Sequence, residues 1–220
     1  MAAAFCLNFS SRTRRRRGRF PDDAASPPLR YDCRMTATDK RAAFGIRRSL
    51  VNADLDGGGL HWLERKFSAH DFSAVERFAL RDGLTSKKKP PGVWGMCSYP
   101  RRGRGYKITC SVKQTLPVEI TTRQRPLYRR EDGTFPSTPY GMRRGQLFVS
   151  RRGGRERAWH RLYGTTTLRN TDEAVVWIVA HEMYHYLRRT RQVDGTNNEI
   201  EADAFSDEML RCYRRYTDAA

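Results

Sequence analysis

The sequence predicts an α+β fold, and two patterns along the chain support this prediction. Several segments between residues 106 and 168 alternate apolar and polar side chains, as strands with one buried face do. From residue 170 onward, apolar residues recur at helical spacing with one interruption. A chain of 220 residues can bury a substantial core. We therefore expect one main domain with a sheet and two C-terminal helices.

The first residues of the chain, 1–34, are predicted to be a disordered, arginine-rich tail. Residues 10–20 carry charge of a single sign, and residues 21–30 are rich in turn-forming residues. Neither stretch has the apolar side chains to bury a core. The tail could be a nucleic-acid-binding arm or a transit-like peptide, or the start of the protein could be assigned too early, because a more ordinary sequence begins at Met35.

Residues 35–90 are predicted to form a helical N-terminal region. One helix is expected over Asp71–Leu80 and another over Lys40–Leu50, with a loop at Asp54–Gly59 between them. The break at Lys87–Gly92 marks a candidate domain boundary. The apolar stripe of the helix expected over Asp71–Leu80 consists of Phe72, Val75, Phe78 and Ala79.

Residues 91–220 are predicted to form the main domain, which begins with strands. The glycines within Arg151–Arg155 indicate a hairpin turn. The expected strands are Tyr106–Val112, Val118–Thr122, Gly145–Ser150 and Arg157–Leu168.

Two helices are expected to complete this domain. Asn170, followed by Glu173 three residues later, resembles a capping box that begins the first helix. The stretch Asp194–Asn197 breaks the pattern, and the second helix is expected to begin near Asn198. The buried side of the first helix is predicted to consist of Val175, Val176, Ile178, Val179, Met183 and Leu187.

Basic residues are concentrated away from the C-terminus. The chain has 42 Lys and Arg against 24 Asp and Glu, yet residues 171–220 carry a net charge of −4. Residues 141–170 contain eight arginines and one acid, Glu156, with Trp159 and Tyr163 interleaved. Such a region could contact phosphates while its aromatic rings stack on bases, so DNA association is one interpretation. The other is a solvated hairpin in an arginine-rich proteome.

Composition excludes two classes of protein. No run of 18 apolar residues occurs, so we expect no transmembrane helix and no membrane partner. The five cysteines are odd in number and form no Cys-x-x-Cys pair, which argues against a disulfide scaffold. The apolar start precedes the arginines, the reverse of a secretory signal. We therefore expect a reduced, cytoplasmic protein.

The first C-terminal helix contains a His-Glu-x-x-His pattern at residues 181–185. His181 and His185 are one helical turn apart, so both imidazoles can hold one zinc ion from the same side. Glu182 lies about 100° around the helix, beside the metal. There it can accept a proton from a metal-bound water, which makes it the candidate catalytic residue. Other divalent ions can occupy such a site.

The second helix offers the missing ligand. Arg188 and Arg191 occupy the positions where an extended His-Glu-x-x-His motif has Gly and His. Glu199 and Asp203 are four residues apart and share a helix face. We expect Glu199 to be the third metal ligand and Asp203 to bond the free nitrogen of a ligating histidine.

The pattern at 181–185, followed by the sequence NEIEADAF at Asn198–Phe205, resembles the gluzincin metallopeptidases. The compact layout is most similar to small zincins of the SprT-like and ImmA/IrrE-like groups, over about residues 170–210. These families often continue with Phe-Ala, where this chain has Phe205-Ser206. The resemblance implies a minimal zincin-like domain with a short mixed sheet, an active-site helix and a ligand-bearing helix. It also implies one Zn²⁺ and hydrolysis of peptide bonds.

The expected substrate is therefore a protein or peptide. Such enzymes pair an extended substrate with an edge strand, and Arg157–Leu168, just before the active-site helix, is the expected edge. Candidate donors to the reaction's oxyanion are Tyr163, Tyr184, Tyr186 and His160. Two alternatives stay open: a non-catalytic zincin-fold protein that binds nucleic acid or regulates, and a hydrolase of a non-peptide amide.

Overall fold

The structure of the chain is a computed structural model that describes residues 41–82, 92–100, 104–113 and 115–219. All of these fall within one compact unit, residues 35–220. The predicted tail and most of the predicted break at Lys87–Gly92 lie outside the described residues. The fold is α+β, as predicted. Its described helices are α1 (Gly58–Lys66), α2 (Thr171–Arg189), α3 (Glu199–Asp218) and the short 3-10 helix η2 (Ala53–Leu55).

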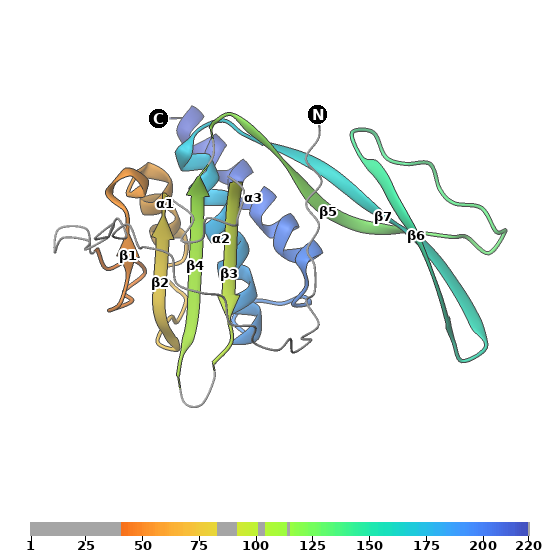
Figure 1. Ribbon diagram of the computed structural model, residues 1–220, viewed down its shortest axis with the longest axis horizontal. Helices are drawn as coiled ribbons and strands as arrows, with labels where there is room; N and C mark the ends of the chain where they lie inside the picture. The colour runs from red at the N-terminus through yellow and green to blue at the C-terminus, as the bar shows by residue number, and fades with distance from the viewer. Residues whose placement is uncertain (1–40, 83–91, 101–103, 114, 220) are drawn as a thin grey trace, which may run out of the picture. The chain divides into compact units, whose positions relative to one another are not determined.

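A four-stranded mixed sheet forms one layer of the fold. Its strands are β1 (Leu50–Val51), β2 (Val75–Arg81), β3 (Gly92–Ser98) and β4 (Tyr106–Lys113), in the order β1-β2-β4-β3. The pairs β1–β2 and β2–β4 are parallel, whereas β3 runs antiparallel to β4. Figure 1 shows α2 behind this sheet, and α3 packs against α2 and β5. The antiparallel strand β3 therefore ends the sheet at one edge.

The hydrophobic core lies between this sheet and α2. Helix α2 is buried along most of its length because the sheet, α1 and α3 cover different sides of it. All six apolar residues predicted for its buried side are at most 3% exposed. This prediction is confirmed. The fully buried side chains from the sheet that meet the helix include Phe78, Leu80 and Ile108.

The predicted helix over Asp71–Leu80 is wrong, because most of this segment forms strand β2. Its last apolar residues, Phe78, Ala79 and Leu80, are consecutive and completely buried. Strand β2 lies between two parallel neighbours, and a parallel strand covered on both faces has a continuous apolar run in place of alternation. A short run of this kind fits a helical stripe equally well.

Three other predictions for the N-terminal region are corrected in part or in full. No helix forms over residues 41–50, where a turn precedes β1. The predicted loop at Asp54–Gly59 includes part of η2 and the first residues of α1. Strands β2 and β3 lie on either side of residue 91 yet belong to the same sheet. The predicted boundary at 90/91 therefore does not separate a helical region from the domain that follows.

A second, antiparallel sheet contains strands β5 (Val118–Tyr128), β6 (Arg143–Arg152) and β7 (Arg155–Leu168). The predicted strands and the turn at Gly153-Gly154 are confirmed; both glycines have positive φ, as a tight turn requires. The order is β5-β7-β6, so β7 is the central strand. The expectation that Arg157–Leu168 is an edge strand is therefore wrong. The sequence shows that Arg157–Leu168 directly precedes α2, but it does not show that β7 also pairs with the distant strand β5.

Within the described ranges, none of the helices is both long enough and apolar enough to cross a bilayer.

Candidate metal centre

Helix α2 carries the two histidines and begins as the sequence predicts. The Asn170 side chain accepts a hydrogen bond from the Glu173 backbone N–H at 2.9 Å. Glu173 in turn accepts from the Arg169 N–H at 2.8 Å, one residue earlier than in a standard capping box. This start fixes the register of the helix, so that His181 and His185 lie one turn apart on the same side.

Helix α3 supplies the carboxylate at its first residue. The Asn198 side chain accepts from the Glu201 N–H at 2.9 Å and caps the helix. The cap places Glu199 at the helix start, where its side chain is 53% exposed. The predicted break before α3 and its predicted start are confirmed. Ala202 is fully buried.

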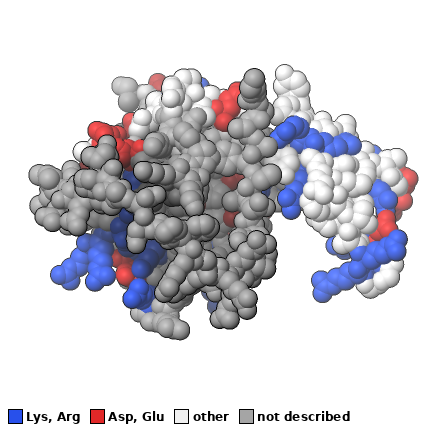
Figure 2. Space-filling model, viewed as in Figure 1, with Lys and Arg blue, Asp and Glu red and all other residues white. Residues whose placement is uncertain are grey.

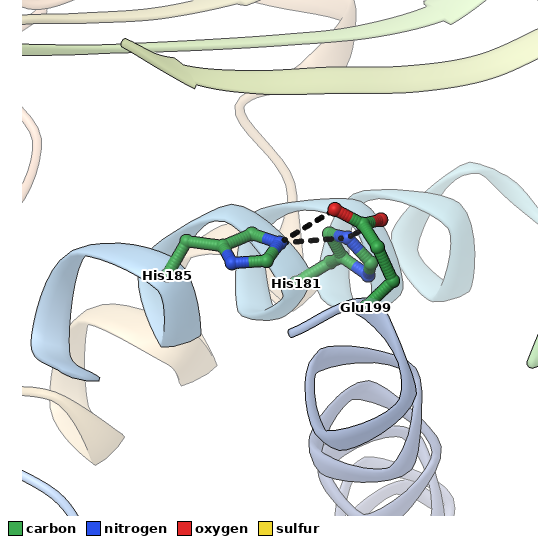
Figure 3. Close-up of side chains that lie close together, drawn as sticks. All are labelled: His181, His185 and Glu199. Atoms are coloured by element: carbon green, nitrogen blue, oxygen red, sulfur yellow. Dashed lines mark hydrogen bonds and ion pairs between the residues drawn. The ribbon is translucent and has the colours of Figure 1, made fainter. Parts of the chain in front are cut away.

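The structure brings His181, His185 and Glu199 together, and we call these three residues the metal centre. Their side chains point toward one another in Figure 3. The two Nε2 atoms are 3.3 Å apart, and each is 3.5 Å from a Glu199 oxygen. One potential ligand atom from each residue lies within 4.8 Å of the others. The sequence predicted this set as metal ligands.

Each histidine also contacts an acceptor on its far side. The Nδ1 atom of His181 approaches Asp203 Oδ1 to 3.1 Å, although without the alignment of a good hydrogen bond. The Nδ1 atom of His185 is 2.9 Å from Asn197 Oδ1. Asp203 thus lies where the sequence predicted, whereas Asn197 was missed. Only its position just before the predicted helix could have pointed to it.

Arg123, on β5, is a further residue that the sequence analysis missed. Its guanidinium forms an ion pair with Glu199 at 2.7 Å, and its backbone N–H donates to Asp203 at 2.6 Å. A single residue of the second sheet therefore contacts two acidic residues of α3. No sequence signal marks Arg123, because it is one of many arginines in a basic segment.

The donor set fits a divalent cation. Nδ1 of each histidine faces an oxygen atom, and a neutral ring with its hydrogen on Nδ1 would present the electron pair of Nε2 to a metal ion. Two imidazole nitrogens and a carboxylate then face one another, which is a stable arrangement only with a cation or a proton between them. Two histidines and one glutamate are a known ligand set of catalytic zinc, with an open fourth position.

The protonation of the metal centre agrees with this fit. Burial lowers the pKa of His181, but the carboxylates of Asp203 and Glu199 outweigh burial and raise it to about 9. The hydrogen bond from His181 holds the pKa of Glu199 at about 2, against the effect of burial. The metal centre thus favours positive charge at the position that a metal ion would take.

Glu182 lies beside the metal centre, against strand β3. It is only 5% exposed, and a Cβ atom at Gly95 would be 2.4 Å from its Oε1. Burial raises the pKa of Glu182 to about 7, although His181 and the Cys97 backbone N–H act in the opposite direction. A carboxylate with a pKa near neutrality is suited to accept and return a proton.

The four candidate oxyanion donors have other partners. The hydroxyl of Tyr186 donates to the Asp71 carbonyl, and that of Tyr184 donates to the Thr196 carbonyl. Tyr163 and His160 belong to β7 in the second sheet, where Arg143 covers the Tyr163 ring and His160 Nδ1 is 3.0 Å from the Gly145 carbonyl. In the described structure, no hydrogen bond joins any of the four to a residue of the metal centre, although the ring of Tyr184 lies against that of His185 with the ring centroids 6.3 Å apart.

A different tyrosine, Tyr99, is linked to the metal centre through the side chain of Asn197. The Asn197 side-chain amide donates to the hydroxyl of Tyr99 at 3.4 Å, and Asn197 contacts His185. Tyr99 follows β3 directly. Tyr99 is not among the site residues that the sequence predicts.

Comparison of the chain with protein-family models, with curated proteins and with solved structures finds no match. The resemblance to gluzincins therefore depends on the residues of this site.

Proposed function

We propose that the protein is a zinc-dependent metallopeptidase with a minimal zincin-like fold. The observation that carries this proposal is the convergence of His181, His185 and Glu199 with the buried Glu182 next to them. A site that only stored or sensed zinc would have no need of Glu182. Its presence favours a hydrolase over a non-catalytic protein that keeps the fold.

The residues of the site divide the chemistry between them. Zn²⁺ bound by the metal centre would polarise a substrate carbonyl and acidify a water molecule. Glu182 accepts the proton of the attacking water and returns it to the leaving amine. Its raised pKa, at about 7, suits both transfers. Asp203 and Asn197 orient the two imidazoles, and Arg123 binds the Glu199 oxygen that also faces His181.

Strand β3 is the proposed binding site for the peptide backbone. It lies at an end of the sheet, and no described strand pairs with its outer edge. Gly95 and Cys97 place this edge next to Glu182. An extended peptide can add to such an edge through main-chain hydrogen bonds. This strand takes the role that the sequence analysis gave to Arg157–Leu168.

A reducing compartment, such as the cytoplasm, is the proposed location. The described cysteines Cys97, Cys110 and Cys212 are free thiols.

The proposal is tested by metal content and proteolysis together. Dialysed protein should contain about one zinc per chain, and Glu199→Ala should lose it. Glu182→Gln should keep the zinc but cleave unfolded casein at least about 100-fold more slowly. Full activity of Glu182→Gln would refute the role of Glu182. Zinc binding without cleavage of any protein substrate would favour the non-catalytic alternative.

A second candidate function, association with nucleic acid, is favoured by the second sheet. Directly paired residues share a face of the sheet, which places Arg143 with Tyr163, Phe148 with Trp159, and Arg152 with Arg155. Figure 2 shows basic side chains along this sheet with uncharged ones between them. We define the basic face as Arg143, Arg152, Arg155, Arg157 and Arg161 with Tyr128, Phe148, Trp159 and Tyr163.

The charges of the basic face are not neutralised within the described structure. No ion pair joins its five arginines to a described carboxylate, whereas Glu156 lies on the opposite face and binds Arg129 and Arg151. Arg161 lies 4.4 Å above the Phe148 ring, which itself stacks on Trp159. Guanidinium groups beside stacked rings can contact a phosphate backbone and its bases together.

This candidate function is tested with labelled single-stranded DNA. The double variant Arg157→Ala/Arg161→Ala should weaken binding about tenfold or more at low salt and reduce its salt dependence. Arg211→Ala/Arg215→Ala on α3 removes the same charge elsewhere and should bind like the wild type. Equal losses in the two variants would show that net charge, and not the basic face, binds DNA. A wild type that does not bind would support a solvated hairpin.

A further inference from the structure

A cation that pairs with no carboxylate of the described residues lies at one end of the proposed substrate edge. Arg189, in the last turn of α2, is exposed and lies 3.6 Å above the ring of Tyr99. No ion pair connects it to a described carboxylate. Its neighbour Arg188 differs, because its guanidinium donates to the carbonyls of Val193 and Gly195 and holds the turn before α3.

Arg189 and Tyr99 are tied to the metal centre through short contacts. The hydroxyl of Tyr99 accepts from Asn197, which contacts His185. The positive charge of Arg189 also lowers the pKa of Cys97, on the same edge strand, although burial of this thiol dominates and raises its pKa. The Arg189 guanidinium thus lies over the Tyr99 ring beside β3.

The direction of β3 defines which part of a peptide would meet Arg189. Gly95 lies beside Glu182, and Tyr99 lies beside Arg189, so β3 and α2 run in the same direction here. A peptide antiparallel to β3 would pass Tyr99 first and the metal centre afterwards. Residues on the N-terminal side of the scissile bond would therefore lie toward Arg189.

The helical rise gives the distance along the peptide. Arg189 is one turn beyond His185 and two turns beyond His181, which is roughly 6–12 Å along the helix axis. An extended peptide covers this distance with about two to three residues.

We propose that Arg189, supported by Tyr99, selects peptides with an acidic side chain two or three residues before the scissile bond. The guanidinium offers a planar set of donors that matches a carboxylate. Its stacking on Tyr99 restricts its motion, so less conformational entropy is lost when a carboxylate binds. This inference depends on the proposed peptidase activity and on substrate addition to β3, and it names the class of substrate.

The test uses the zinc-loaded full-length chain and a library of peptides from a protease-digested proteome. Sequencing of the products should show Asp and Glu enriched two or three positions before the cleaved bond. A matched pair of synthetic peptides, with Glu or Gln at the enriched position, should differ about fivefold in kcat/KM. Arg189→Gln should remove this difference, and Arg189→Glu should reverse the preference toward Lys. Arg215→Gln, an exposed arginine on α3, is the matched control and should keep the preference.

The outcomes separate the two proposals. Cleavage without acidic enrichment, or a preference that survives Arg189→Gln, would overturn the role of Arg189 and leave the peptidase activity standing. If zinc-loaded protein cleaves no peptide in the library, the peptidase proposal itself fails. Zinc content of each variant, measured alongside, should equal that of the wild type, because Arg189 contacts no residue of the metal centre.

Discussion

Gly95 lies against the carboxylate of Glu182, and the space between them leaves no room for a side chain. A Cβ atom there would be 2.4 Å from Oε1 and 2.5 Å from Cγ of Glu182. Glu182 is buried, so it has little freedom to move aside. The absence of a side chain at Gly95 therefore allows the proposed proton acceptor to sit beside the metal centre.

We predict that Gly95→Ala lowers peptidase activity about 100-fold while zinc content stays the same. The reason is displacement of Glu182 by roughly 1 Å, which catalytic geometry tolerates poorly. Met96→Ala is the matched control, since this exposed side chain lies on the same strand and points to the opposite face. Wild-type activity in Gly95→Ala would show that the position of Glu182 is not decisive.

Glu173 is a buried acid whose charge is compensated by its partners. Burial raises its pKa, but Arg214, which binds both carboxylate oxygens, and the Arg169 N–H outweigh burial and hold the pKa below its ordinary value of 4.5. The unfolded chain therefore takes up this proton first as the pH falls. The stabilisation is complete above about pH 4.5 and is lost as the pH falls through the folded pKa.

We accordingly predict that Glu173→Gln lowers the free energy of unfolding at pH 7 by about 2–3 kcal/mol, because Arg214 loses its charged partner. The difference between variant and wild type should shrink as the pH falls below about 4.5. Glu208→Gln is the control, because its ion pairs are exposed and should contribute little. Urea denaturation across this pH range measures both effects. A difference that is constant with pH would contradict the ionised state of Glu173.

At the scale of elements, two asparagine caps of the same geometry begin α2 and α3. Each side chain accepts from the backbone N–H three residues later at 2.9 Å. Asn198, however, directly precedes the ligand Glu199, whereas Asn170 is 11 residues before His181. Loss of either cap frays the first turn of its helix.

We predict that Asn198→Ala and Asn170→Ala each lower the free energy of unfolding by about 1 kcal/mol. Only Asn198→Ala should also weaken zinc binding, because fraying there releases Glu199. Competition with a chromogenic chelator measures the zinc affinity of both variants. Equal zinc affinity in the two would mean that Arg123 alone suffices to position Glu199.

The elements differ in how well their sequences reveal them. Helices α2 and α3 were predicted because each combines a cap with a long apolar stripe. Strand β2 was missed because its buried residues are consecutive, which suits a helix or a covered parallel strand. Strand β3 has no alternation in the sequence Gly92–Ser98, where Trp94, Gly95 and Met96 follow one another.

The same limit applies to the candidate site. The spacing of His181, Glu182 and His185 within one helix, and of Glu199 and Asp203 in the next, could be read from periodicity alone. Arg123 and Tyr99 could not, because they reach the metal centre through the pairing of distant strands. Such long-range placement has no local signature in a single sequence.

At the scale of the whole molecule, the metal centre connects three parts of the chain. His181 and His185 belong to α2, and Glu199 belongs to α3. Arg123 links Glu199 and Asp203 to β5 of the second sheet. An unfolded chain does not hold Glu199 beside the two histidines, so zinc that binds to all three residues stabilises the folded state.

We predict that zinc at 100 times its dissociation constant increases the free energy of unfolding by about 2.7 kcal/mol, which corresponds to a rise in Tm of about 5–10 °C. A chelator should reverse the rise. Glu199→Ala should fold but show little response to zinc, since two histidines alone bind it weakly. Calorimetry with and without zinc measures the shift in both proteins. If Glu199→Ala were stabilised as strongly as the wild type, zinc would be binding elsewhere, for instance to the free thiols, and the assignment of the metal centre would fail.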